Sequence, residues 1–398
     1  MHYAELIEHR RPWLKGVVLQ PGLTQARGEP ADEMLERIIR GYRLASAAER
    51  DRNVVRSGPW RRIRSQHMGE LVSLLEAGEP AALAAYLREL PLRQAGHGFF
   101  QGKAAFDTTV ANPVAERQRL VWIMDALCGL AESLGVLGVV CPEGRPTIPT
   151  DPPTVAELVD RIESMTGLPL GVPHICAGLF GLAAGDRVIH VRSACAVYAA
   201  GRIRDWLDER TGGPLGDCGI GEIGPGIGLV PTLLATLGAR RLTLIDIPEL
   251  NAMQAYFLHQ SLPTHRLTLF GEPSSADGKT IRIMPDFEFL DGLEPPLDLL
   301  LNQDSLPELD LPTVHRYLDR IPRAARYFLS INQETRVPES TPLAGGFLPS
   351  MLRNAEGYRF LYRMPAWCRA GYLEEMFRCG SDESYPPTRS DSSSQGSL

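Results

Sequence analysis

Lysine is scarce in this sequence, because only Lys15, Lys103 and Lys279 occur among 41 basic residues and the remainder are arginine. Acidic residues number 48, so the net charge is −7, and no run of five or more Lys or Arg interrupts the acidic balance. Nucleic-acid binding is therefore disfavoured, since it depends on clustered basic side chains. The excess of Arg and Ala is typical of a GC-rich bacterial genome.

Long hydrophobic runs are absent as well. The longest strongly apolar stretch, residues 134–141, is far shorter than the roughly 20 residues that cross a bilayer, which excludes a membrane span. The seven cysteines are odd in number and form no C-x-x-C pair, which argues against a disulfide framework and a zinc ribbon. The first residues lack a basic segment followed by an apolar core, so we expect a cytoplasmic protein.

Metal-ligand spacings are also missing. Nine histidines are present, but no H-x-x-x-H or E-x-x-H pattern falls on a predicted helix. We therefore predict no metal site.

The composition is otherwise that of a globular protein, with 44% hydrophobic residues over 398 positions. Residues 1–150 carry apolar residues at helical spacing and predict a helical N-terminal domain. We expect this domain to act as a lid, to bind a small-molecule substrate or to form a homodimer interface. Prolines between residues 142 and 153 indicate a linker, and the Ser-rich residues 381–398 are expected to be a disordered tail.

From residue 165 to residue 380, short apolar runs alternate with amphipathic segments, which predicts an α/β fold with a doubly wound parallel sheet. The predicted parallel strands are residues 217–223, 241–246, 280–285, 297–302 and 326–332. The predicted helices are residues 190–210, 227–237, 249–260 and 312–321. Two late strands, near 358–364 and 371–378, are expected to form an antiparallel hairpin at the sheet edge.

The most informative segment connects the first two strands. Residues 222–228 read E-I-G-P-G-I-G, and Asp246 ends the second strand 18 residues after the last of these glycines. Glycine lets the backbone turn sharply and approach a ligand closely. A carboxylate at the end of the second strand can accept hydrogen bonds from both hydroxyls of a ribose. The segment therefore predicts a nucleoside cofactor bound by Glu222, Gly224, Gly226, Gly228 and Asp246.

The spacing also bears on which cofactor binds. Counted from Gly224, the dinucleotide pattern G-x-G-x-x-G requires a sixth-position glycine where the chain has Leu229. An overlapping match from Gly219 places Glu222 inside the pyrophosphate turn, where its charge opposes phosphate. S-adenosylmethionine has no phosphate, and its ammonium group suits an acidic neighbour. The pattern thus favours a methyl donor, with an NAD-dependent oxidoreductase as an alternative.

Together with three later segments, this pattern resembles the bacterial sugar O-methyltransferases of the class I S-adenosylmethionine-dependent superfamily. These segments are residues 246–249 (D-I-P-E), 302–308 (N-Q-D-S-L-P-E) and 330–334 (S-I-N-Q-E), and the resemblance covers roughly residues 165–380. It implies a Rossmann-like class I methyltransferase sheet, S-adenosyl-L-methionine as cofactor, and a hydroxyl of a sugar or glycosylated metabolite as the methyl acceptor. Two alternatives are an O- or N-methyltransferase of a non-sugar natural product, and a protein that binds the cofactor but catalyses a non-methylating reaction.

Polar residues after the strands supply the remaining candidates, because open α/β sheets bind ligands beyond the carboxyl ends of their strands. Further cofactor-binding residues are predicted at Ile247, Asp286 and Asn302. The catalytic candidates are Asp304 as general base, then Glu308 and His315. We expect Asn332 and Glu334 to orient the acceptor. Structural roles are the alternatives: a helix cap for Asp246, a turn for Asp286, a helix boundary for His315, and loop caps for Asn332 and Glu334.

Overall fold

The structure, a computed structural model, describes residues 14–20, 32–52, 54, 58–96, 99–100, 102–139, 151–211, 214–273, 278–292, 297–334 and 349–380. The predicted tail and most of the predicted linker lie outside these ranges. The chain divides into two compact units, each assembled from segments that are distant in sequence. The sheet unit contains residues 30–84, 202–366 and 371–398, and the second unit contains residues 1–29, 85–201 and 367–370.

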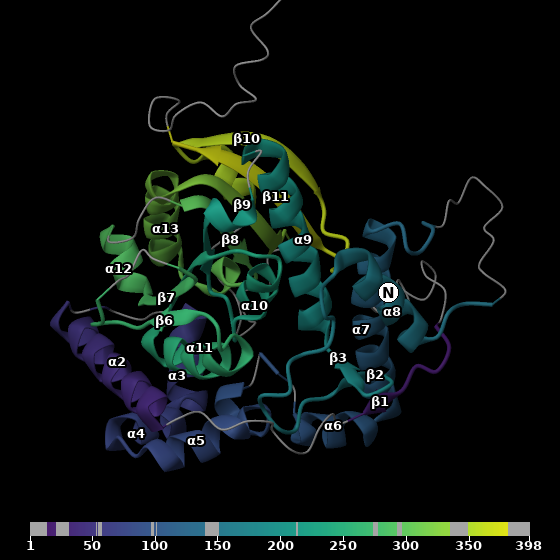
Figure 1. Cartoon of the computed structure of the whole chain (residues 1–398), viewed down its shortest axis with the longest axis horizontal. Helices are drawn as coiled ribbons and strands as arrows, with labels where there is room; N and C mark the ends of the chain where they lie inside the picture. Colours follow the sequence, from purple (N-terminus) through teal and green to yellow (C-terminus); the bar gives the residue numbers. More distant parts are fainter. Residues whose placement is uncertain are drawn as a thin grey trace, which may run out of the picture. The chain divides into compact units, whose positions relative to one another are not determined.

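The sheet unit is built on eight strands in the order β10-β11-β9-β8-β4-β5-β7-β6 (Figure 1). Their bounds are β4 (Gly219–Ile223), β5 (Arg241–Asp246), β6 (Arg266–Thr268), β7 (Thr280–Pro285), β8 (Leu297–Gln303), β9 (Ala325–Gln333), β10 (Tyr358–Pro365) and β11 (Tyr372–Cys379). Strands β4 to β9 pair in parallel, whereas β11 pairs antiparallel with both β9 and β10. This doubly wound, Rossmann-like sheet confirms the predicted fold class and the predicted hairpin. Strand β6 was not predicted.

Register brings the carboxyl ends of the central strands together. Ile223 of β4 lies beside Ile245 of β5 and beside Asn302 of β8. Strand β4 has β5 on one side and β8 on the other, so the strand order reverses at β4. Parallel sheets bind ligands at such a point, and we expect a crevice for a ligand beyond the end of β4.

Helices cover the two faces of this sheet. One core cluster joins β4, β5, β7, β8 and β9 to α12 (Asp286–Asp291) and α13 (Leu311–Ala324) through buried residues such as Ile223, Phe289 and Val314. The side chains that alternate with these face α10 (Leu229–Thr236), where Ile220 and Leu242 meet Val230. Helix α11 (Pro248–Ser261) packs against β5 and β7. Both faces are thus buried, as a parallel sheet requires.

Residues 30–84 belong to the sheet unit, which differs from the predicted boundary near residue 150. Helix α2 (Asp32–Asp51) packs along α11, and its buried stripe includes Met34, Leu35 and Ile38. Arg37 of the same helix donates two hydrogen bonds of 2.8 Å to the Glu272 carboxylate. Helices α3 (Gly58–His67) and α4 (Gly69–Ala77) follow. The helical spacing of residues 1–150 predicted helices in this region, but neither α3 in particular nor the surface on which they pack.

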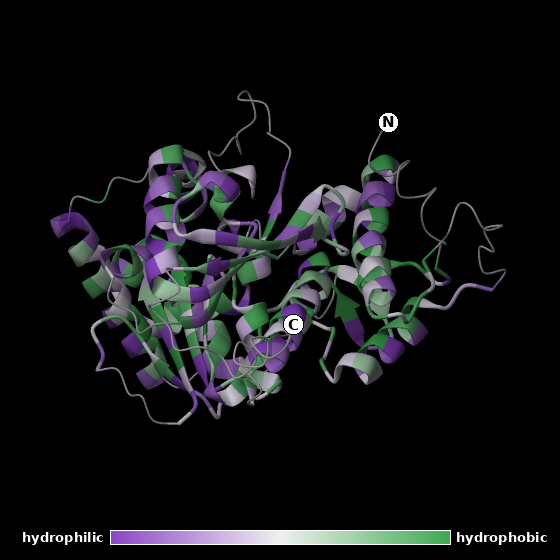
Figure 2. Ribbon diagram, turned by 90° about the horizontal axis from the view of Figure 1, so that it is seen from above, coloured by the Kyte–Doolittle hydropathy of each residue, from purple (hydrophilic) through white to green (hydrophobic). Residues whose placement is uncertain are grey.

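The second unit is mainly helical, with α6 (Lys103–Val110), α7 (Pro113–Ser133), α8 (Val155–Thr166) and the first half of α9 (Val191–Thr211). A small antiparallel sheet of β1 (Leu19–Gln20), β2 (Gly181–Ala184) and β3 (Arg187–Ile189) was not predicted. Helix α5 (Pro80–Arg88) continues from one unit into the other. Helix α8 is amphipathic, with Val155, Leu158, Val159 and Ile162 buried on one face, and hydrophobic and hydrophilic residues alternate along helices of the ribbon in Figure 2. No helix in the described ranges combines the length and hydropathy needed to cross a membrane.

Candidate functional site

The loop after β4 has the backbone that the glycine pattern predicts. Gly224, Gly226 and Gly228 all have positive φ, at +66°, +59° and +100°. A Cβ built on Gly224 would lie 2.3 Å from the Cβ of Ser305, in the loop after β8. Only glycine therefore allows these two loops to approach so closely. The loop after β4 ends where Gly228 caps α10.

Glu222 is buried just before this loop. Its carboxylate lines an apolar cavity with about 200 Å³ of empty volume, together with Ile203, Val230 and Leu234. Atom Oε2 has no hydrogen-bond partner among the described residues. Burial, with the negative charge of Asp246 as the second cause, raises the pKa of Glu222 to about 8. An unpaired buried carboxyl is costly, which makes Glu222 a candidate for function.

Asp246 is connected directly to the glycine loop by a residue that sequence reasoning missed. Its Oδ1 accepts a hydrogen bond of 2.9 Å from the Ile247 backbone, and its Oδ2 accepts one of 2.8 Å from the Gln254 side chain. The same Gln254 nitrogen donates to the Gly226 carbonyl at 2.9 Å. Ile247, not Asp246, is the N-cap of α11. The contacts therefore fix Asp246 relative to the loop, as a ribose-binding carboxylate requires.

Asp286 lies at the corresponding position after β7. It is the first residue of α12, is 5% exposed, and accepts a 2.9 Å hydrogen bond from the Phe287 backbone. The register pairs Asp246 with Pro285, so the two carboxylates follow neighbouring strands at the same edge.

Asn302 and Asn332 are fully buried and hydrogen-bonded to protein groups. The Asn302 amide donates to the Ile223 carbonyl at 3.0 Å and to the Ser305 hydroxyl, and its Oδ1 accepts from the Asn332 amide at 3.0 Å. Asn332 also donates to the Ser330 hydroxyl at 2.9 Å. These contacts hold both amides between the strand ends.

Asp304 is held above this network in an unusual conformation. Its φ is +73°, the one positive φ of a non-glycine residue in the described ranges. Its backbone N–H donates to Asn332 Oδ1 at 3.0 Å. Left-handed backbone costs roughly 1–3 kcal/mol for a side-chain-bearing residue and occurs often at functional sites. Glu308 ends the short helix η4 (Leu306–Glu308) that follows, and both residues are half-buried.

Two other predicted site residues, Glu334 and His315, lie outside this hydrogen-bonded group. Glu334 forms a 2.9 Å ion pair with Arg363, which also contacts the buried Glu375 at 3.2 Å. His315 is exposed on α13, whose buried stripe is formed by Val314 and residues on the same side. The structure therefore does not bring His315 into the buried group that contains Asn302 and Asn332.

Helix α3 connects the segments that follow β8 and β5. It contacts η4, which follows β8, and its Arg64 forms a 2.6 Å ion pair with Glu249 in the first turn of α11, which follows β5. Arg64 also pairs with Glu49 of α2 at 2.9 Å. Since β8 and β5 flank β4, α3 spans the position where the glycine loop begins. Glu249 is completely buried, so this ion pair is a desolvated one.

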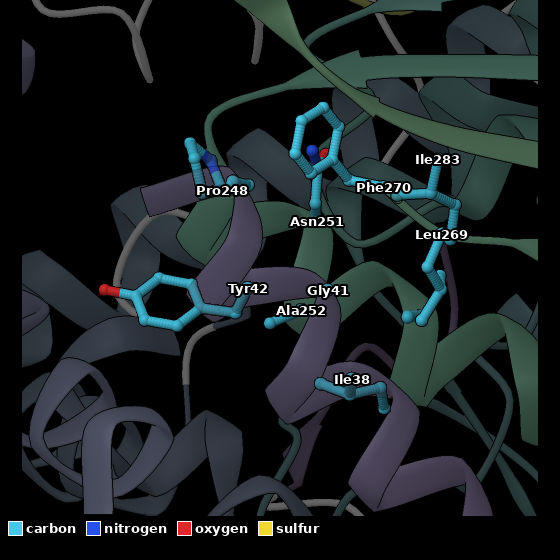
Figure 3. Close-up of a pocket in the computed structure, with 11 residues that line it drawn as sticks. Ile38, Gly41, Tyr42, Pro248, Asn251, Ala252, Leu269, Phe270 and Ile283 are labelled. Carbon is cyan, nitrogen blue, oxygen red and sulfur yellow. The ribbon is translucent and has the colours of Figure 1, made fainter. Parts of the chain in front are cut away.

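A separate hollow lies between α2 and α11 and has about 280 Å³ of empty volume. Figure 3 shows its apolar lining, including Ile38, Ala252 and Ile283, with the Tyr42 hydroxyl directed away from the α11 residues. Burial, with a contribution from the charge of Glu249, raises the pKa of Tyr42 to about 12. None of the predicted site residues lines this hollow, so it is distinct from the strand-end site.

Of the two residues that sequence reasoning missed, Gln254 and Arg64, only Gln254 has a signal in the sequence. Gln254 is a lone polar residue among Met253, Ala255, Tyr256 and Phe257, eight positions after Asp246, and a buried amide must find partners. Arg64 carries no such signal, because its partners Glu49 and Glu249 are defined only by the packing of three helices.

Comparison with solved structures identifies a group of similar folds. The chain is 15% identical to the mitomycin 7-O-methyltransferase MmcR, covering 86% of this chain and 94% of that chain with a TM-score of 0.34. It is 15% identical to magnesium protoporphyrin IX methyltransferase from Synechocystis PCC 6803 with bound S-adenosylhomocysteine, covering 50% of this chain and 90% of that chain with a TM-score of 0.36. Both of these solved proteins are methyltransferases.

A third similar structure is the N-methyltransferase NodS from Bradyrhizobium japonicum WM9, at 15% identity, with 48% of this chain and 97% of that chain covered and a TM-score of 0.34. No protein-family model matches the chain. No curated protein matches it either. At these identities and TM-scores, the chemistry of this chain must be argued from its own residues.

Proposed function

We propose that this protein is an S-adenosylmethionine-dependent O-methyltransferase. The observation that carries the proposal is the connection of Asp246 to Gly226 through Gln254, next to a glycine loop with a buried carboxyl beneath it. Asp246 supplies ribose acceptors, and Glu222, which is protonated at neutral pH in the unliganded protein, supplies negative potential under the loop once a nearby positive charge lowers its pKa. That potential favours a cofactor with sulfonium and ammonium charges over the pyrophosphate of NAD.

The residues present fit this cofactor. Gly224, Gly226 and Gly228 would hold it against the backbone, Asp246 would bind the ribose, and Asp286 and Ile247 would flank the adenine. S-adenosylmethionine, when bound, supplies an electrophilic methyl group on a positively charged sulfur. In this proposal Asn302 and Asn332 position the backbone at the strand ends and do not contact the ligand.

The chain's own contribution to methyl transfer is positioning and proton removal. Holding an acceptor hydroxyl in line with the methyl carbon can supply about 7–11 kcal/mol. Asp304 is the proposed base for the hydroxyl proton and Glu308 the second candidate, and such a base adds about 10²–10⁴-fold. Glu334, oriented by Arg363, is proposed to align the acceptor. No step is assigned to the exposed His315.

The acceptor is proposed to be a hydroxyl of a sugar or glycosylated metabolite. Support for this class comes from the resemblance of residues 302–308 and 330–334 to sugar O-methyltransferases. A base made of carboxylates suits a neutral hydroxyl, since it must remove a proton as the methyl group is transferred.

Calorimetry with S-adenosylmethionine, S-adenosylhomocysteine and NAD tests the cofactor. We expect saturable heat with the first two and none with NAD. Formation of S-adenosylhomocysteine in the presence of sugar, phenol and amine acceptors then separates the acceptor classes. A folded sample that binds NAD alone would contradict the proposal.

A further inference from the structure

The second unit contains a cationic cluster that the strand-end site does not use. The guanidinium of Arg119, in α7, lies 4.9 Å from the ring centroid of Trp122 and 5.9 Å from that of Phe180. Phe106 packs edge-on against Phe180, with centroids 5.8 Å apart. Stacking on these rings restricts the orientation of the guanidinium plane.

Arg119 forms no ion pair with any carboxylate in the part of the chain that the structure describes. By contrast Arg187, in the same unit, pairs with Asp160 at 2.6 Å and with Glu163 at 2.7 Å. Burial lowers the pKa of Arg119, and no described acidic residue opposes this shift. A stacked guanidinium keeps its N–H donors at its edge, in the geometry that binds an oxyanion through two bonds.

His190 provides a second donor. The side chain is 4% exposed, and its Nδ1 accepts a 3.2 Å hydrogen bond from the Arg192 backbone. The ring proton is therefore on Nε2, which has no hydrogen-bond partner among the described residues. Burial lowers the pKa of His190 to about 3, with smaller contributions from the charges of Arg192 and Arg119, so the ring is neutral.

Strand register brings these groups together, because Leu182 of β2 pairs with Ile189 of β3, so that Phe180, which Arg119 contacts, and His190 lie at the same end of this strand pair. Both Arg192 and Arg119 act electrostatically on His190, and no acidic residue contributes to its pKa. Helix α9, 21 residues long, begins directly after His190, so the positive end of its dipole adds to the field. The local potential is thus positive, and two side-chain donors have no acceptor among the residues that the structure describes.

We propose that Arg119 and His190, at the start of α9, bind the oxyanion of a small organic ligand whose ring packs against Trp122. The shared chemistry is a carboxylate or a phosphate monoester. The ligand that would supply it is a ring-bearing small molecule separate from the proposed cofactor. Binding of an oxyanion here does not depend on methyl transfer.

The test is titration of the full chain with benzoate and phenyl phosphate, measured by calorimetry and by tryptophan fluorescence. The variant Trp122→Phe shows which part of the fluorescence change comes from Trp122. Benzyl alcohol and phenol are the neutral counterparts. We expect saturable binding of the two anions only. Arg119→Gln should weaken it by roughly tenfold or more, because a hydrogen bond to a charged group is lost. Arg119→Lys should bind with intermediate affinity, and Arg117→Gln, an exposed position on the same helix, should bind like the parent.

Titration with S-adenosylhomocysteine distinguishes this ligand from the proposed cofactor. Binding of S-adenosylhomocysteine should be unchanged in Arg119→Gln, whereas loss of its binding would contradict a separate oxyanion site. The proposal is overturned if folded parent protein binds neither anion, if the neutral counterparts bind equally well, or if Arg119→Gln binds like the parent. Failure of the proposed methyltransferase function alone would leave anion binding intact.

Discussion

The left-handed backbone of Asp304 allows its chemistry to be separated from its conformation. Asn tolerates positive φ far better than Ala, and it lacks the basic carboxylate. Asp304→Asn should therefore retain the parent's unfolding free energy to within about 0.5 kcal/mol, whereas Asp304→Ala should lose about 1 kcal/mol or more. Both variants should lose about 10²–10⁴-fold in methyl transfer. Urea denaturation and S-adenosylhomocysteine formation measure the two effects, and a fully active Asp304→Asn would remove its role as base.

Glu222 gives the sheet unit a pH dependence of defined sign. Its pKa rises from an ordinary value of 4.5 to about 8, so the folded protein retains a proton that the unfolded chain releases between these values. Stability contributed by the protonated group therefore falls as pH rises from about 5 to about 8. Glu222→Gln cannot release this proton.

Denaturation of parent and Glu222→Gln at pH 5 and pH 9 measures this linkage. The variant should gain about 2–5 kcal/mol relative to the parent over that interval, since each pKa unit corresponds to about 1.4 kcal/mol. Parallel pH profiles for the two proteins would show that Glu222 titrates normally.

Gln254 is a positioning residue whose effect should appear in cofactor affinity. Gln254→Ala removes the donor shared by Asp246 and Gly226 and keeps the hydrogen bond from the Ile247 backbone to the carboxylate. The dissociation constant of S-adenosylhomocysteine should rise roughly tenfold, as expected for losing a hydrogen bond to a charged group. Calorimetry measures it, with the exposed Gln118→Ala as control. An unchanged constant in a folded variant would refute this role.

At the scale of elements, the position of α3 depends on one cation between two carboxylates. Arg64→Gln removes the cation that pairs with the buried carboxylates of Glu249 and Glu49, at a cost of about 3–5 kcal/mol. We expect faster amide hydrogen exchange over residues 58–67 and weaker cofactor binding. Combining Arg64→Gln with Glu249→Gln should recover part of the stability, and Arg62→Gln, exposed on the same helix, should change neither measurement. Unchanged exchange would show that α3 is held by apolar packing.

How well each element could be predicted depends on the range of the interactions that form it. Strands β5 and β7 occupy the predicted residues 241–246 and 280–285. Their positions could be predicted because the apolar residues that identify each strand lie within the strand itself. The positive φ values of the glycine loop were likewise encoded locally. The packing of α2 on α11 was not, since an apolar stripe specifies burial but not a partner.

The same distinction applies within the site. Asp246 was identifiable from its place after a strand and its distance from the glycines. The burial of Asn302 and Asn332 could not be predicted, because the sequence does not distinguish polar residues that contact a ligand from polar residues that contact each other. Their mutual hydrogen bond depends on the pairing of β8 with β9, residues that are 30 positions apart.

At the scale of the whole molecule, the two units are interleaved along the chain, so neither corresponds to a single continuous segment. A truncated chain of residues 165–398 contains all eight strands of the large sheet but lacks α2, α3 and α4. Its α11 would expose the apolar surface that α2 covers, including Ala252 and Ala255, and Glu249 would lose Arg64. We therefore expect this fragment to bind a hydrophobic dye and to unfold without cooperativity.

Adding the separate peptide 30–84 should restore part of the cooperative transition, because it supplies both the apolar stripe of α2 and the cation of α3. Circular dichroism and dye fluorescence of the fragment, with and without the peptide, measure this recovery. The peptide with Arg64→Gln and Ile38→Asp is the matched control, since it removes the ion pair and part of the stripe that packs on α11. Cooperative unfolding of residues 165–398 alone would mean that the sheet unit is complete without its N-terminal helices, and that the α2–α11 contact contributes little to its stability.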